Sequence, residues 1–116
     1  MGIHSSTNCG SEDGVRIELK SKTALCKTKP YGGFSAGDTL NWTGEQLGNC
    51  TTAHFDPMAE TISLWIKTSI NDKFCPIWVK IVLNDQEDTS YMLPIPEEPW
   101  HNIDDKQNKT YTAKKL

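Results

Sequence analysis

Short segments in which apolar and polar residues alternate strictly are the feature that most constrains this chain. Two of them are unambiguous, and they span residues 15–21 and 77–83. Their apolar sides consist of Val15, Ile17 and Leu19 in the first segment, and of Ile77, Val79, Ile81 and Leu83 in the second. A period of two is typical of a strand with one buried face. The pattern therefore predicts two strands, of which residues 77–83 form a central one.

Three further segments favour extended structure. Residues 34–41 show a period of two after a predicted turn at residues 29–33, where a proline and two glycines stand. Residues 58–70 fit either a helical stripe or alternation, and their Ile, Thr and Trp content favours a strand. Residues 91–95 alternate again, and the prolines at the end of this segment confine it to a sheet edge.

These strands, separated by turn residues and without a convincing long helix, predict an all-β fold. We expect an antiparallel β-sandwich of about eight strands. A chain of 116 residues fits a single domain. Residues 1–100 would form this domain, and residues 101–116, which are polar and lack periodicity, would form a flexible C-terminal tail.

Composition and charge narrow the class of partner. The net charge is -3 without a basic stripe, so the electrostatic footprint expected of a nucleic-acid-binding protein is missing. No run of apolar residues approaches the length of a membrane span, and we expect no transmembrane segment.

The four cysteines indicate the redox compartment. Cys9, Cys26, Cys50 and Cys75 form an even set without a Cys-x-x-Cys pair, which favours two disulfides over a zinc ribbon or a redox motif. Four buried thiols in a cytosolic protein are the alternative. Three pairings are permitted, and we favour Cys26 with Cys50 and Cys9 with Cys75, because each bond then ties a loop to a neighbouring strand end.

Three glycosylation sequons point in the same direction. They begin at Asn41, Asn49 and Asn108, where chance would give about one in a chain of this composition. The amino end is polar and lacks the apolar core of a signal peptide. We therefore expect an extracellular, secreted protein whose signal peptide has been removed.

Several motifs together resemble a known family. They are Val15-Arg16-Ile17-Glu18-Leu19, Phe34-Ser35-Ala36-Gly37-Asp38, Trp78-Val79-Lys80-Ile81, Tyr91-Met92-Leu93-Pro94 and Trp100. In this order they are similar to the PLAT, or lipoxygenase-homology, domain over residues 13–100. The region before Gly14, where the first family strand would lie, is polar and short.

The resemblance implies a sandwich that binds membranes, lipid-handling partners or other proteins, with calcium in the loops of some members. Glu12 and Asp13 align with the loop in which calcium-binding members carry acidic ligands, and Asp38 falls at a predicted loop. Calcium prefers several oxygen ligands gathered on loops. Solvated turn carboxylates are the alternative interpretation, and no other cofactor is expected.

Catalytic constellations are missing from the sequence. There is no Gly-x-Ser-x-Gly elbow, and no histidine stands in a pattern that would activate a nucleophile. Cys50 and His54 have the spacing of half a zinc site, but two further ligands are not evident. The sequence therefore predicts that this chain is not an enzyme.

Aromatic and basic residues supply the candidate binding surface. Trp42 stands at a predicted strand end and Trp65 on a strand with a polar opposite face, so both would be exposed anchors. A glycan on Asn41 would crowd Trp42, and packing at the sandwich end is the alternative for that side chain. A lysine cluster suits anionic lipids or sulfated glycans, unless it is an ordinary solvated face. Its members are Lys20, Lys22, Lys27 and Lys29.

These observations predict a secreted, non-catalytic binding module for a lipid or membrane surface or for an extracellular protein. Two alternatives stay open. The first is an extracellular effector or inhibitor whose loops around Trp42 and Lys27 bind a host protein or glycan. The second is a detached regulatory domain of a lipase-like enzyme.

Overall fold

The computed structural model describes residues 1–7, 11–21, 25–68, 75–83, 89–95 and 110–116. Within these ranges the chain forms nine strands and two short 3-10 helices. The strands are β1 (Gly2–Thr7), β2 (Ser11–Lys20), β3 (Leu25–Lys27), β4 (Tyr31–Phe34), β5 (Thr39–Thr43), β6 (Thr61–Thr68), β7 (Pro76–Val82), β8 (Ser90–Pro94) and β9 (Tyr111–Lys115). The 3-10 helices, η1 (Gly44–Leu47) and η2 (Thr52–His54), follow β5.

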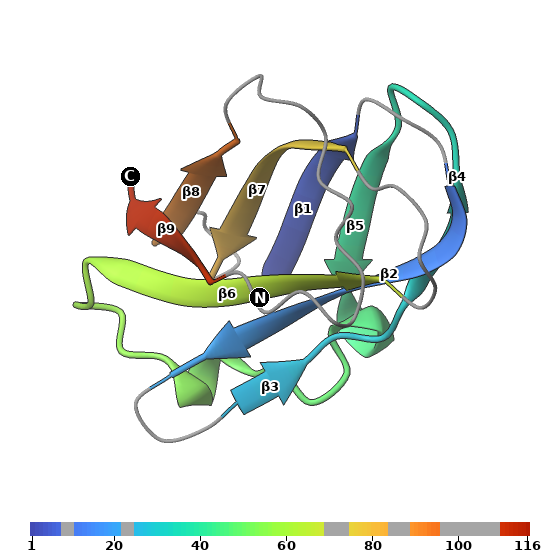
Figure 1. Ribbon diagram of the computed structural model, residues 1–116. Helices are drawn as coiled ribbons and strands as arrows, with labels where there is room; N and C mark the ends of the chain where they lie inside the picture. The colour runs from blue at the N-terminus through green and yellow to red at the C-terminus, as the bar shows by residue number, and fades with distance from the viewer. Residues whose placement is uncertain (8–10, 22–24, 69–74, 84–88, 96–109) are drawn as a thin grey trace.

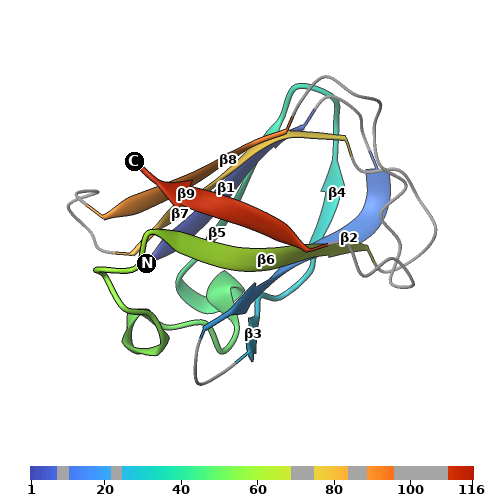
Figure 2. The same cartoon turned by 60° about the vertical axis from the view of Figure 1, so that its left-hand side comes forward.

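The strands pair antiparallel into one sheet in the order β3-β2-β6-β9-β8-β7-β1-β5, with β4 also paired to β2. This sheet curls into a half-barrel (Figure 1), and a turn of the view shows its two walls facing each other (Figure 2). The all-β antiparallel prediction is confirmed. Two separate packed sheets are not confirmed, because β9 pairs with β6 on one side and with β8 on the other, which joins the walls into one sheet.

The C-terminal residues correct the predicted tail. Tyr111–Lys115 form β9, although the sequence there is polar, and residues 101–109 lie outside the described residues. Pairing to the backbone edges of β6 and β8 stabilises this strand, and Ala113 is the residue that it buries in the core. The edge prediction for β8 is wrong for the same reason, since Tyr91 and Met92 pair with β9.

The amino end also forms a strand that its polar sequence did not predict. β1 lies between β5 and β7, so it occupies the middle of one wall. Ile3, Ser5 and Thr7 are buried, and they alternate with the half-buried His4 and Ser6. The Ser5 hydroxyl donates to the carbonyl of Trp78 at 2.9 Å, which satisfies a polar group that would otherwise be costly to bury.

The alternating segments correspond to β2, β7 and β8, and the segment whose composition favoured a strand corresponds to β6. Ile77 departs from its predicted buried face with 45% of its surface exposed, because it stands at the beginning of β7. The predicted turn at residues 29–33 is partly wrong, since β4 begins at Tyr31 and pairs with β2. The following turn lies at Gly37, whose φ of 89° suits glycine, and separates β4 from β5.

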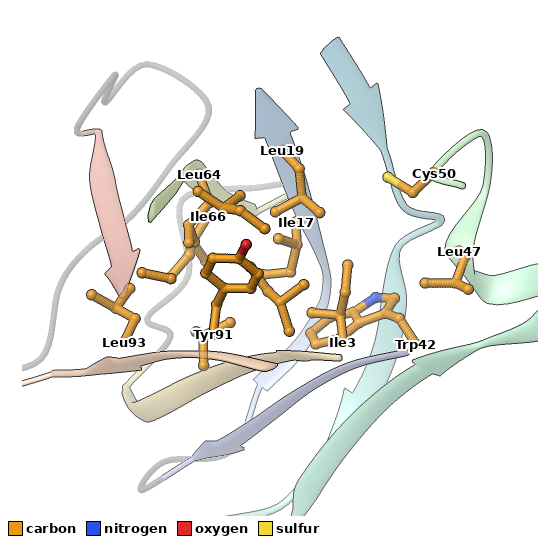
Figure 3. Packing of buried hydrophobic residues seen from close by; sticks show 14 of the residues in the cluster. Ile3, Ile17, Leu19, Trp42, Leu47, Cys50, Leu64, Ile66, Tyr91 and Leu93 are labelled. Atoms are coloured by element: carbon orange, nitrogen blue, oxygen red, sulfur yellow. The ribbon is translucent and has the colours of Figure 1, made fainter. Parts of the chain in front are cut away.

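A single apolar cluster fills the concave side of the sheet. Ile17 and Leu19 of β2 and Leu64 and Ile66 of β6 face Tyr91 across the interior (Figure 3). Each of these side chains is almost completely buried. Ile3 and Trp42 close the same cluster on the side of β1 and β5. The core therefore takes up the apolar face of every long strand, and any binding surface must come from the ends and the outer face.

Candidate binding site

Trp42 is a core residue and not an exposed anchor. None of its surface is exposed, its indole nitrogen donates to the carbonyl of Lys29 at 3.0 Å, and its ring meets Tyr31 edge to face at 5.9 Å. Residues of β5 alternate between exposed and buried positions, and the register with Ile3 of β1 turns Trp42 inward. Burial of Trp42 also removes the anchor on which the effector alternative relied.

Trp65 is half-buried on the outer face of β6, and its indole nitrogen donates to the Thr110 hydroxyl at 3.0 Å. Its neighbours along the strand, Leu64 and Ile66, point into the core. The sheet therefore lies between Trp65 and Trp42, and the two predicted anchors do not contribute to one surface.

The lysines of the predicted cluster remain on the surface. Lys20, Lys27 and Lys29 are exposed, and Lys22 lies outside the described residues. Lys20 ends β2 opposite Leu25 of β3, and Lys27 follows two residues later on the same exposed side of that strand. The β2–β3 hairpin therefore holds Lys20 and Lys27 beside an exposed apolar residue.

The calcium candidates lie on the beginning of β2 and on the β4–β5 turn, which follows the strand that pairs with β2. Glu12 and Asp13 fall within β2 and not in a loop, and nothing of their side chains is described. Asp38 caps the β4–β5 turn, where its carboxylate accepts from the Ser35 backbone at 2.9 Å. Among the described residues no three His, Cys, Asp or Glu side chains gather around a common point.

The described cysteines lie at both ends of the half-barrel: Cys26 is paired with Leu19 near the end of β2, whereas Cys75 precedes β7 and lies beside Thr7. Cys26 and Cys50 are bonded to each other, as predicted, so the Cys50 thiol is not available for half a zinc site with His54. Cys75 is disulfide-bonded as well, and Cys9, its predicted partner, lies outside the described residues.

Two sequon asparagines are exposed on the surface. The side-chain oxygen of Asn41 lies 2.7 Å from Nδ1 of His4, and that of Asn49 accepts from the Lys27 backbone at 2.7 Å. The Asn49 contact uses the amide oxygen, whereas the amide nitrogen of Asn41 also donates to the carbonyl of Thr39 at 3.3 Å. Asn108 lies outside the described residues.

A cleft of about 670 Å³ is lined by residues from the end of β2, the beginning of β6 and the segment that contains η2. Its volume is in the range of small-molecule sites, about 300–1,000 Å³. Phe55, Ala59 and Ile62 supply apolar lining, and Lys20, His54 and Asp56 supply the charged and polar groups. We call the residues 51–60, which form one side of the cleft, the cleft loop.

The cleft loop is held to the half-barrel at several points. The Cys26–Cys50 disulfide fixes its beginning to β3. The Thr52 hydroxyl donates to the carbonyl of Leu83 at 2.8 Å, and the Tyr91 hydroxyl donates to the carbonyl of Ala59 at 2.5 Å. These anchors position the cleft before any partner arrives.

Electrostatics near the cleft are mixed. Burial raises the pKa of Tyr91, and the negative charges of Asp56 and Glu60 raise it further. The phenol is therefore neutral at physiological pH and donates its hydrogen bond to the cleft loop. Asp56 itself accepts from the Met58 backbone at 2.9 Å, which forms a turn at the tip of the loop.

Two large apolar side chains flank the cleft without entering the core. Met58 at the tip of the cleft loop is 77% exposed, and Leu25 on β3 is 45% exposed. Met58 stands between the lining residues Asp56 and Ala59, and Leu25 is paired with the lining residue Lys20. We call the set of Met58, Leu25, Lys20 and Lys27 the cleft rim.

Sequence reasoning found only part of this site. Lys20 and Lys27 were singled out by their charge, and His54 by its spacing from Cys50. Met58 opens the segment whose composition favours a strand, and neither Met58 nor Leu25 stands in a motif that marks a binding residue. The Asp56-Pro57 pair was the available signal, since Asp and Pro together favour a turn that exposes the next residue.

The fold and the site together define an all-β, disulfide-bonded half-barrel with a cleft at one end. The sequence matches no protein-family model and no curated protein. Among the described residues, no helix is long and apolar enough to cross a membrane.

Proposed function

We propose that this chain is a secreted, non-catalytic binding module that docks onto an anionic lipid surface through its cleft rim. The observation that carries the proposal is Met58, a large apolar side chain that is 77% exposed on a tightly held loop. The Asp56 turn, the Tyr91 hydrogen bond and the contact of the Lys115 ammonium with the Pro57 carbonyl at 2.7 Å keep the Met58 backbone in place. Its exposure is therefore a feature of an ordered element.

The cleft rim combines the two contributions that interfacial membrane binding uses. Burying a large apolar side chain such as Met58 is worth about 1.5–3 kcal/mol. Each lysine near an anionic surface adds about 1 kcal/mol, and Lys20 and Lys27 are both exposed on the β2–β3 hairpin. Sums of this size support weak and reversible association with anionic lipids.

The position of the rim predicts how calcium should act. β2 runs from Ser11 at the far end to Lys20 at the cleft, and Phe34, near the turn that Asp38 caps, pairs with Ser11 (Figure 1). The acidic residues proposed as calcium ligands therefore lie a full strand length from the rim. Docking through the rim is independent of calcium, even if calcium binds at the far end.

Secretion belongs to the same proposal. The Cys26–Cys50 disulfide is compatible with an oxidising compartment, and Asn41 and Asn49 present exposed sequons. Asn49 contacts the Lys27 backbone, so a glycan there would stand beside the rim. Removing that sequon by Asn49→Gln in glycosylated material should increase lipid binding or leave it unchanged.

The test is co-sedimentation of the oxidised protein with vesicles of phosphatidylcholine alone and of phosphatidylcholine with phosphatidylserine, in calcium and in chelator. We expect the protein to bind the vesicles that contain phosphatidylserine and not those of phosphatidylcholine. The bound fraction should be the same in calcium and in chelator. Met58→Ala should weaken this binding about tenfold. Ile77→Ala is the matched control, because Ile77 is also an exposed apolar residue but lies near the beginning of β7, at the far end.

Three outcomes would contradict the proposal. Binding that chelator abolishes would assign the docking to the far end. Absence of binding to either vesicle would favour an extracellular protein partner instead. An equal loss in Met58→Ala and Ile77→Ala would show that the cleft rim is not the contact.

A further inference from the structure

The cleft contains a histidine whose buried ring nitrogen has no partner. Nδ1 of His54 is inaccessible to solvent and meets no hydrogen-bond partner among the described residues, while the side chain as a whole is half-buried where it lines the cleft. A neutral imidazole carries its proton on one nitrogen only, and a buried N–H without an acceptor is costly. We therefore assign the proton to Nε2, which makes this nitrogen the hydrogen-bond donor of the ring.

A second donor lines the same cleft. Lys20 is exposed at the end of β2, offers three N–H groups and no acceptor, and carries a positive charge. The Asp56 carboxylate also lines the cleft and keeps its negative charge, although one of its oxygens accepts from the Met58 backbone. The two side-chain donors favour a ligand with an acceptor group, and the charge of Lys20 favours an anionic one that lies closer to Lys20 than to Asp56.

The remaining lining favours an apolar body for that ligand. Phe55 lies edge to face against the His54 ring at 6.5 Å, so an aromatic surface adjoins the donor. Ala59 and Ile62 continue the apolar lining toward β6. The small side chain of Ala59 leaves space in the cleft. The volume of about 670 Å³ exceeds what a simple ion bound by Lys20 and His54 would fill, and it lies in the range of small-molecule sites.

From this arrangement we infer that the cleft binds one small amphiphilic carboxylate, with Nε2 of His54 and the Lys20 ammonium on its carboxylate and Phe55, Ala59 and Ile62 against its apolar chain. This inference goes beyond docking on a lipid surface, because it concerns a single dissolved molecule inside the cleft. A free monocarboxylate and a lipid headgroup are both anionic. The experiment therefore tests a dissolved carboxylate and lipid vesicles as separate ligands.

The probe is dodecanoate held below its critical micelle concentration, titrated into the oxidised full-length protein by calorimetry and followed by amide chemical shifts. We expect saturable binding of one molecule per chain, with the largest shifts at residues 53–63. Three control compounds test the features of the ligand. Dodecanol has the chain without a charge, dodecyltrimethylammonium has the chain with a positive charge, and acetate has the carboxylate without the chain. Each of these three should bind at least tenfold more weakly than dodecanoate.

Variants assign the contacts. His54→Phe keeps a ring against Phe55 but removes the donor, and it should weaken dodecanoate binding about tenfold to hundredfold. His54→Gln retains an N–H donor and should recover part of the loss. Ala53→Phe, at an exposed position in the cleft lining, should fill the cleft and abolish binding. Circular dichroism melts confirm that each variant is folded before it is compared.

The two proposals fail in different ways. Met58→Ala should lose vesicle binding and keep dodecanoate binding, whereas His54→Phe should lose dodecanoate and keep the vesicles. Unchanged affinity in folded His54→Phe, equal binding of the cationic amphiphile, or no saturable signal with dodecanoate would each overturn the carboxylate site. None of these results would affect docking through the rim.

Discussion

The walls of the half-barrel and the cleft loop are held together in opposite ways. The walls pair every long strand with neighbours and bury apolar side chains such as Ile17, Leu64 and Ile81 completely. The cleft loop buries one aromatic residue, Phe55, and is otherwise fixed by a disulfide and single hydrogen bonds. The walls therefore supply most of the buried apolar contacts, and the cleft loop carries Met58, the most exposed large apolar residue among those described.

This difference explains why two large apolar side chains, Trp42 and Met58, lie in opposite environments. Trp42 is a candidate anchor with packing at the sandwich end as its alternative, and it lies in the core because β5 is paired in register with β1. Met58 belongs to no strand, and its backbone is fixed by polar contacts that make no demand on its side chain. Substitutions in the two regions should therefore separate stability from binding.

The largest effect should come from the wall. Ile17→Ala removes a completely buried side chain from β2 and leaves a cavity, so the free energy of unfolding should fall by about 2–5 kcal/mol. Urea unfolding followed by circular dichroism measures this change. A loss below that of an exposed control such as Met58→Ala would show that the concave cluster is not the stabilising core.

Next in size is the disulfide that joins the two regions. The Cys26→Ser/Cys50→Ser double variant removes a bond across a sequence separation of 24 residues and should cost about 2–4 kcal/mol in unfolding free energy. Because Cys50 precedes the cleft loop, dodecanoate binding should weaken as well. If stability falls and the binding affinity of the folded fraction is unchanged, the loop is held without the disulfide and the comparison must be revised.

A smaller effect concerns the hydrogen bond between wall and loop. Burial, together with Asp56 and Glu60, raises the pKa of Tyr91 above its ordinary 10.0, so the folded state holds the phenolic proton more tightly than the unfolded chain does. The resulting stabilisation is fully present below about pH 10 and is lost as the pH rises through the raised pKa. Burial raises the pKa of Tyr111 in the same direction.

Tyr91→Phe tests this relation. It should cost about 0.5–1.5 kcal/mol at pH 7, because the contact with the Ala59 carbonyl is lost. Tyrosine titrates between about pH 9 and 11, and in this range the free energy of unfolding should fall less steeply with pH in the variant than in the unsubstituted protein. Tyr111, which the variant retains, preserves part of that pH dependence. Parallel urea titrations at each pH supply the measurement, and identical slopes would exclude a role for the Tyr91 proton.

The smallest stability effect is expected at the tip of the loop. Met58→Ala should change the free energy of unfolding by less than about 0.5 kcal/mol, because the side chain is mostly exposed and its backbone contacts persist. Its effect on anionic vesicles should nevertheless be the largest of these variants. A destabilisation comparable to that of Ile17→Ala would mean that Met58 packs as a core residue.

Neighbouring strands show how far the sequence could be interpreted. β7 was recognisable because Val79 and Ile81 alternate with outward residues, and β1 beside it was not, because Ser5 and Thr7 occupy its inward positions. Hydroxyl groups can be buried when they reach a backbone carbonyl, as Ser5 does, but that partner lies 73 residues away in the sequence. A contact of this range leaves no local pattern.

The candidate site was predictable to a similar degree. The charge of Lys20 and Lys27 was visible in the sequence, and the tight turn at residues 56–58 was inferable from the Asp-Pro pair. The cleft itself was not, because it arises where the end of β2, the beginning of β6 and η2 meet. The calcium candidates stay predictions, and their position at the far end is a result of the register between β2 and β4.

The sequence by itself determined the class of fold. Alternation specified β2, β7 and β8 and composition favoured β6, since period-two burial and strand propensity are local properties of the chain. The favoured Cys26–Cys50 pairing, one of three that the sequence permits, agreed with the structure. Tertiary structure alone decided that β9 closes the sheet, that Trp42 lies inside and that Met58 lies outside. These outcomes depend on which backbone edges and which apolar surfaces remain unpaired after the strong strands have assembled, and no local pattern encodes that.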